Sequence, residues 1–81
     1  MRPSDYLAPA DLYLGSDTRA ALAEGPRSFR TAAKAISFAV EHAAPVSLRG
    51  ARLVVGDRHF TGPQLKAMHR SAAFRAAARL H

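Results

Sequence analysis

The stretch SFRTAAKAISFAVEHAAP, residues 28–45, carries the clearest structural pattern in the chain. Either Ser28 or Thr31 is expected to cap a helix here, because each hydroxyl can accept from a free amide of the first turn. Pro45 is expected to end the helix, since proline disfavours helical geometry at the residue before it. The stretch therefore predicts a long amphipathic helix. Its apolar face comprises Phe29, Ala32, Ala33, Ile36, Val40 and Ala43.

Phe38 and His42 lie outside this face, where a simple amphipathic helix would be polar. A second apolar edge is usually covered, and the tyrosines and leucines of residues 6–14 are the nearest candidates in the sequence. If it were uncovered, Phe38 would form an exposed apolar patch of the kind that marks interaction sites. Two interpretations follow. Either this edge belongs to the core, or Phe38 and His42 contact a protein partner or a second copy of the chain.

The segment ARLVVGDRHFTG, residues 51–62, predicts a β-hairpin with Gly56-Asp57 as its turn. In this register Leu53 is opposite Phe60, and their face is expected to pack against the helices. An isolated hairpin is only marginally stable, so a third strand is needed. Either VSLRG, residues 46–50, or DLYLG, residues 11–15, can supply it.

The segments on either side complete the expected fold. Residues 16–26, SDTRAALAEGP, predict a short helix that stops at Gly-Pro. The capping box Thr61-x-x-Gln64 opens a second long helix, whose periodicity falters around Phe74. Residues 75–81 are therefore expected to form a separate helical turn or a mobile tail.

The prolines within residues 1–15 argue against a helix there and favour an extended strap over the core. With 81 residues, the chain has room for one small domain. The prediction is a single α+β domain over residues 1–81, with a short helix, a long helix, a hairpin and a second long helix after the N-terminal strap.

Three apolar motifs carry a family resemblance: Phe29-x-Thr31, Ala35-Ile36-x-Phe38-Ala39-x-Glu41 and Ala51-x-Leu53-x-Val55. Together they resemble a group of short bacterial proteins of unknown function. The resemblance covers about residues 29–75 and implies a helix–hairpin–helix core. It implies no activity.

The charge of the chain is uneven. Residues 1–26 hold two basic and four acidic residues, a balance of −2, whereas residues 27–81 hold ten basic and two acidic residues, a balance of +8. Such a body favours nucleic acid or an acidic protein as partner, although a GC-rich genome produces the same arginine and alanine bias without selection for binding. The expected phosphate-binding surface comprises Arg30, Lys34, Arg52, Arg58, Lys66 and Arg70.

The sequence offers little for catalysis. It lacks cysteine, its four histidines have no zinc-site spacing, and it contains no nucleophile elbow or phosphate-binding glycine loop. We therefore expect no enzyme activity, metal, cofactor or small-molecule substrate. No apolar run resembles a signal peptide or approaches the roughly 20 residues that span a bilayer, so we expect a cytoplasmic protein without membrane contact.

Overall fold

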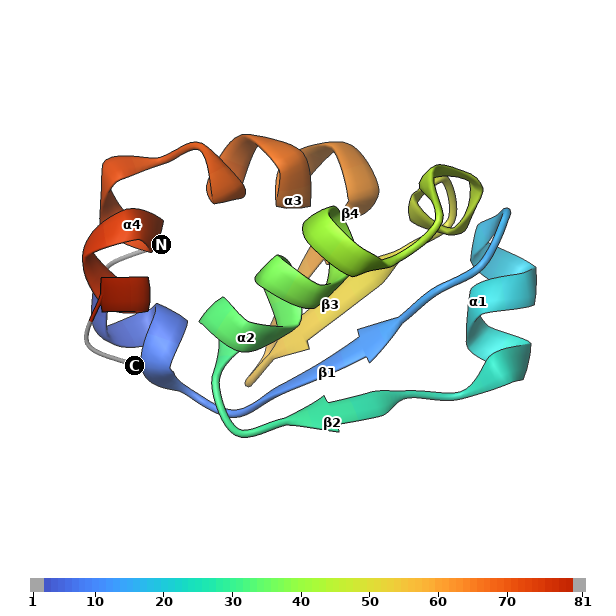
Figure 1. Cartoon of the computed structure of the whole chain (residues 1–81). Coiled ribbons are helices and arrows are strands. Elements are labelled where there is room, and N and C mark those ends of the chain that lie inside the picture. Colours follow the sequence, from blue (N-terminus) through green and yellow to red (C-terminus); the bar gives the residue numbers. More distant parts are fainter. Residues whose placement is uncertain (1–2, 80–81) are drawn as a thin grey trace.

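Four strands form one antiparallel sheet in the order β2-β1-β3-β4. The computed structural model describes residues 3–79. Helices α2 and α3 lie over one face of this sheet, while α1 and α4 lie at opposite ends of the molecule (Figure 1). The chain is a single two-layer α+β domain, which confirms the predicted fold class. Its strands are β1 (Ala10–Tyr13), β2 (Arg27–Phe29), β3 (Arg52–Val55) and β4 (Arg58–Thr61), and its helices are α1 (Thr18–Glu24), α2 (Ala32–Ser37), α3 (Gly62–His69) and α4 (Ala72–Arg79).

The predicted hairpin is present as β3 and β4, with Leu53 opposite Phe60. Gly56 has a φ of 62°, a backbone conformation that glycine adopts without strain, and this explains why the turn falls there. The third strand is β1, which includes most of DLYLG. The alternative segment VSLRG instead contributes to a 3-10 helix, η3 (Pro45–Leu48).

The N-terminal segment is part of the core rather than an extended strap. Residues Pro3–Leu7 form a 3-10 helix, η1, and β1 then occupies a central position in the sheet. Tyr6 is 1% exposed and packs edge-on against Phe74, with ring centroids 5.8 Å apart. Its hydroxyl lies 3.2 Å from the Ser71 hydroxyl. These contacts connect the start of the chain to α4.

The long helix of residues 28–45 begins at Thr31, whose hydroxyl accepts from the amide of Lys34 at 3.2 Å. The α-helical part ends at Ser37 and continues as a π-helical turn, η2 (Phe38–His42). The amide of Ala43 closes this turn on the carbonyl of Phe38 at 3.0 Å. The helix ends before Pro45, as predicted.

The π turn shifts the buried face of this helix. Ala35 and Ala39 are fully buried, although the predicted apolar face excluded them. Val40 and Ala43, which belonged to that face, are only half-buried. The prediction was wrong after Ser37 because the π turn contains an extra residue and rotates the segment that follows it. Ala35 precedes this turn, and it is buried because α2 contacts the sheet as well as η1, α3 and α4.

The second long helix is broken in two. The Ser71 hydroxyl donates to the carbonyl of Met68 at 2.7 Å and accepts from the amide of Phe74 at 3.1 Å, so it ends α3 and caps α4. Phe74 and Ala77 of α4 are buried. Of the predicted tail, residues 75–79 belong to α4, and residues 80–81 lie outside the described residues.

The core lies between the sheet and the helical layer. Its largest fully buried aliphatic side chains are Leu12, Ile36, Leu53 and Leu65, contributed by two strands and two helices. Within residues 3–79, no helix is long and apolar enough to cross a membrane.

Candidate functional site

The cations predicted to bind phosphate lie on separate surfaces. Lys34 is exposed in the first turn of α2, and Arg30 is exposed just before that helix. Lys66 is exposed on α3, and Arg70 is exposed at the C-cap of α3. Arg52 lies opposite Tyr13 in the β1–β3 strand register. Because neighbouring residues of a strand point to opposite faces and Leu53 is buried, Arg52 lies on the sheet face away from the helices.

Arg58 has a partner within the domain. Its guanidinium lies 3.8 Å from the carboxylate of Asp5. The structure therefore does not join all six predicted residues into one surface. Of the remaining cations, Lys34 lines one hollow, and Lys66 and Arg70 line another. Arg30 lies just before α2 and lines neither of them.

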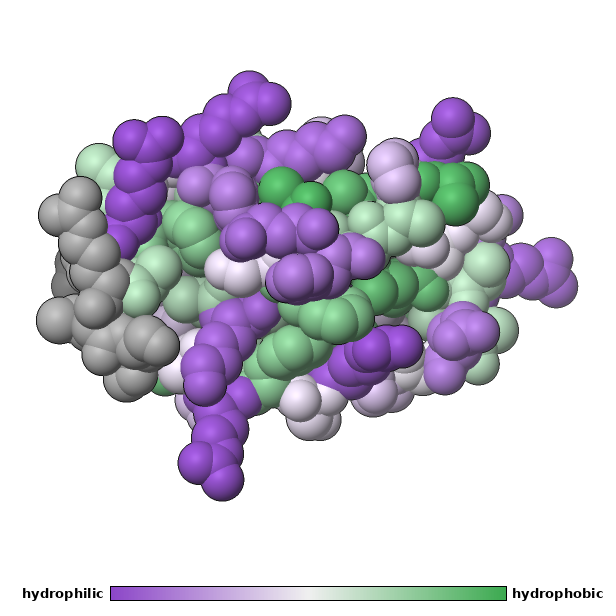
Figure 2. Space-filling model, viewed as in Figure 1, coloured by the Kyte–Doolittle hydropathy of each residue, from purple (hydrophilic) through white to green (hydrophobic). Residues whose placement is uncertain are grey.

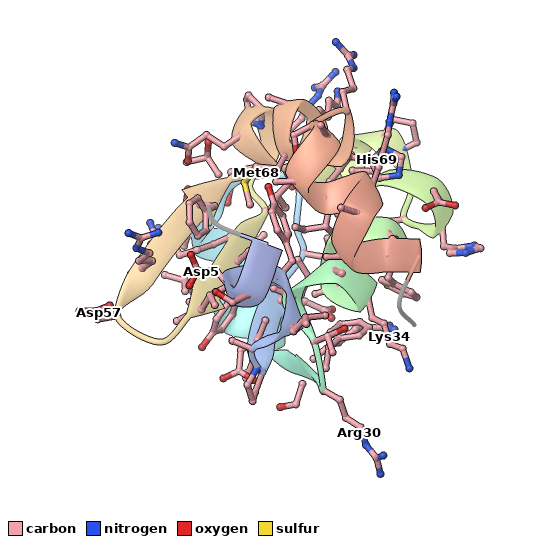
Figure 3. All side chains as sticks on the ribbon, turned by 90° about the vertical axis from the view of Figure 1, so that its left-hand side faces the viewer. Asp5, Arg30, Lys34, Asp57, Met68 and His69 are labelled. Carbon is pink, nitrogen blue, oxygen red and sulfur yellow. The ribbon has the colours of Figure 1, made fainter. Side chains whose placement is uncertain are left out.

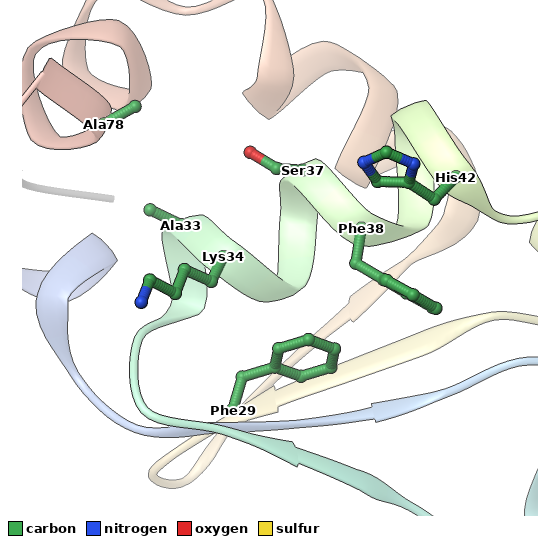
Figure 4. A pocket seen from close by; sticks show the side chains of 7 residues that line it. All are labelled: Phe29, Ala33, Lys34, Ser37, Phe38, His42 and Ala78. Atoms are coloured by element: carbon green, nitrogen blue, oxygen red, sulfur yellow. The ribbon is translucent and has the colours of Figure 1, made fainter. Parts of the chain in front are cut away.

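The first hollow lies between the helical layer and the end of β2. It has a volume of about 320 Å³, and its wall is mainly apolar (Figure 4). We call it the phenylalanine groove. Its lining residues are Phe29, Ala33, Lys34, Ser37, Phe38, His42 and Ala78.

Three rings follow one another along this groove. Phe29 and Phe38 are half-buried, with centroids 5.6 Å apart and ring planes inclined at 46°. The His42 ring lies 6.1 Å from Phe38. In Figure 4 Phe38 points from the helix toward Phe29, and His42 lies at the opposite end of the groove from Lys34. Because the π turn spans Phe38–His42, it places both rings at the groove.

Positively charged side chains lie next to these rings. The guanidinium carbon of Arg27 lies 5.1 Å from the centroid of Phe38, within the range of a cation–π interaction. Lys34 lines the groove, and Arg30 projects from the loop after Phe29 into solvent (Figure 3). No carboxylate belongs to the groove wall within the described residues. In Figure 2 an apolar band crosses this face over the α2–η2 segment and the neighbouring strands, with hydrophilic side chains at its margins.

The residues that pack against Phe38 differ from those predicted to do so. The N-terminal tyrosines and leucines were expected to cover this edge of the helix, but Phe29 and Arg27 of β2 do so instead. Tyr6 packs against Phe74. Phe38 is therefore neither a sealed core residue nor a bare patch. Sequence reasoning missed the site role of Phe29 and Arg27, because a three-residue strand after Gly-Pro gives almost no local pattern.

The second hollow lies between η3 and α3. It consists of two adjoining hollows that share Pro45, Leu48 and Lys66. We call it the proline groove. Arg70 belongs to one end of it, and Arg49 to the other.

One hydrogen bond lies at the edge of the proline groove. The Nε2 atom of His69 lies 3.1 Å from the Glu41 carboxylate and so connects α3 to η2. This hydrogen bond holds the pKa of Glu41 below its ordinary value of 4.5. The His69 ring also packs on Phe74, with centroids 5.0 Å apart. His69 is therefore engaged within the domain.

In the part of the chain that the structure describes, no three histidine, aspartate or glutamate side chains converge as metal ligands. The arrangement is suited to binding, since it combines two hollows with cations at their edges.

Comparison of the chain with models of protein families, with curated proteins and with solved structures gives no match.

Proposed function

We propose that this domain is a non-enzymatic basic module that binds single-stranded nucleic acid in the phenylalanine groove. One observation carries the proposal. Two half-buried phenylalanine rings line a hollow together with Lys34, Arg27 lies against one of these rings, and no described carboxylate belongs to the wall. Arg30, the residue after Phe29, adds a third exposed cation. Aromatic faces together with cations are the two components that single-strand binding requires.

The aromatic part favours single strands over duplexes. Nucleobases stack on phenylalanine and histidine rings, but the bases of a duplex are already stacked on one another. In the groove, Phe29 and Phe38 offer ring surface, and Arg27 keeps a guanidinium against Phe38. A guanidinium plane can itself support a base or contact a phosphate.

The charged part sets the affinity and its salt dependence. Arg27, Arg30 and Lys34 can each contact a phosphate, whereas few fixed hydrogen-bond partners line the groove to read base edges. Binding is therefore expected to be weakly sequence-selective. Three phosphate contacts on a single strand give a log–log salt slope of about −2, since each contributes about −0.7. We expect the domain to act in the cytoplasm, where single-stranded RNA is accessible.

Fluorescence anisotropy with labelled oligothymidylate and oligouridylate across a salt series tests the proposal. The double variant R30E/K34E should bind more weakly, and its salt slope should fall to about −0.7, as expected for one remaining contact. The double variant K66E/R70E is the matched control, because it makes the same change in net charge on α3. Equal loss in both double variants would mean that net charge, and no particular groove, attracts the nucleic acid.

The stacking contribution has its own variant and control. Phe38→Leu keeps an apolar side chain but removes the ring, and it should weaken binding by about five-fold or more, as loss of one stacked base does. Phe60→Leu makes the same change in a half-buried residue of β4, at the opposite edge of the sheet. Binding unchanged by Phe38→Leu would refute the role of the ring.

Self-association through Phe38, His42 or an open strand edge is the alternative function. Both edge strands, β2 and β4, begin with arginine, and Pro26 precedes β2. Arginine and proline at sheet edges disfavour edge-to-edge pairing. The edges thus favour the nucleic-acid proposal. Sedimentation equilibrium over a concentration range tests the alternative directly.

A further inference from the structure

The proline groove differs chemically from the phenylalanine groove. Its walls are aliphatic, and Val46, which is 50% exposed, stands at its edge beside Pro45 and Pro63. The aromatic ring that borders it, His69, is already bonded to Glu41. A nucleobase would find no free ring to stack on here, whereas an aliphatic side chain would find an apolar hollow.

Three cations surround this apolar hollow. Lys66 lies on α3, one turn before Arg70, which is the C-cap of that helix, and Arg49 is the C-cap of η3. All three are exposed, and none forms an ion pair within residues 3–79. Like charges at this helical spacing repel each other slightly, so a partner that brings carboxylates would relieve that repulsion. The groove is therefore complementary to negative charge around an apolar anchor.

The groove is also largely preformed. Pro45 opens η3 and Pro63 lies in the first turn of α3, which limits the backbone freedom of both walls. The backbone of Gly62 approaches the carbonyl of Leu48 so closely that an added Cβ would collide with it. A preformed site loses less conformational entropy on binding than a flexible one.

From these features we infer that the proline groove docks an acidic protein segment: an extended peptide whose aliphatic side chain enters the hollow while flanking carboxylates meet Arg49, Lys66 and Arg70. The inference is independent of nucleic-acid binding in the phenylalanine groove. The domain would then have two binding surfaces, one for a single strand and one for an acidic partner protein.

The test uses a short fluorescein-labelled peptide rich in glutamate with two leucines at its centre. Two matched peptides replace the leucines by serine or the glutamates by glutamine. Anisotropy should show that the first peptide binds. Either matched peptide should bind at least about ten-fold more weakly, because one lacks the buried leucines and the other lacks several ion pairs. K66E/R70E should weaken binding about ten-fold as well, since it reverses two of the three cations. V46S should weaken it about three-fold, because only part of a valine side chain loses its contact.

The control R30E/K34E should leave peptide binding unchanged. Far-UV circular dichroism of each variant checks the fold, which exposed substitutions should preserve. Three results would overturn the inference. Equal binding of the serine peptide would identify a general anion surface. Loss of peptide binding in R30E/K34E but not in K66E/R70E would place the peptide in the phenylalanine groove. No binding at low salt would exclude the docking site altogether.

Discussion

Replacement of Phe38 by alanine measures how firmly the phenylalanine groove is built. Truncation of a fully buried phenylalanine costs about 3–5 kcal/mol. Phe38 is half-buried and rests on Phe29 and Arg27, so about half of that cost, about 2 kcal/mol, is expected. A domain of 81 residues has a total stability of about 4–12 kcal/mol. Phe38→Ala should therefore remain folded.

Urea unfolding followed by far-UV circular dichroism provides the assay. A small domain has an m-value of about 1 kcal/mol/M, so Phe38→Ala should lower the midpoint by about 2 M. Ile36→Ala is the matched control on the same helix, because Ile36 is fully buried. It should cost about 4 kcal/mol, twice as much.

Either extreme would refute this reasoning. If Phe38→Ala costs as much as Ile36→Ala, the Phe38 ring is sealed in the core and has no surface to offer a ligand. If Phe38→Ala costs nothing, the contacts with Phe29 and Arg27 do not hold the ring in solution. An intermediate cost agrees with a ring that is anchored but still accessible.

Three further changes test the fold around the two grooves. Thr31→Ala removes the side-chain cap of α2 and should cost about 1 kcal/mol in urea unfolding; an unchanged midpoint would show that the cap is dispensable. Glu41→Gln weakens the bond to His69. The pKa of Glu41 is lowered in the fold, so the bond stabilises above the ordinary value of 4.5 and this stabilisation is lost as the pH falls through the lowered pKa. The variant should therefore have a lower urea midpoint than wild type at neutral pH and an equal one in strong acid, whereas a gap that persists in acid would contradict this. Gly50→Ala places a Cβ against the backbone of Asp17 and should destabilise by about 1–3 kcal/mol, and a neutral result would show that this approach relaxes easily.

Local patterns in the sequence predicted the elements that depend on local interactions. The Gly56-Asp57 turn, the Thr31 cap and the Thr61–Gln64 capping box all involve residues within a few positions of one another. The turn and the capping box were predicted as observed, because short-range geometry determines them, and Thr31 was one of the two caps predicted for the long helix. The hairpin register followed from the turn.

Elements that depend on distant contacts were predicted incompletely. The strand β2 has three residues and is held by pairing with β1, so its sequence alone does not mark it. The π turn left only an indirect trace, the apolar Phe38 on an apparently polar side. The break at Ser71 had a better signal, since a serine followed by a run of helix formers is a common cap.

The candidate sites show the same division. Sequence reasoning selected Lys34 with Phe38 and His42 in separate hypotheses, but the fold places all three in one groove. Phe29 and Arg27 were missed, because their approach to Phe38 depends on where β2 lies in the sheet. Charge alone could not separate Arg58, which pairs with Asp5, from the cations beside the hollows.

Chemical-shift mapping by NMR tests the central claim most directly. Isotope-labelled protein would be titrated with short oligothymidylate at low salt, and the backbone amide shifts would be followed for each residue. Binding in the phenylalanine groove predicts that the largest shifts fall in residues 27–42, on β2, the loop after it and the α2–η2 segment. Shifts confined to α3 and η3, or spread evenly over every exposed cation, would contradict it.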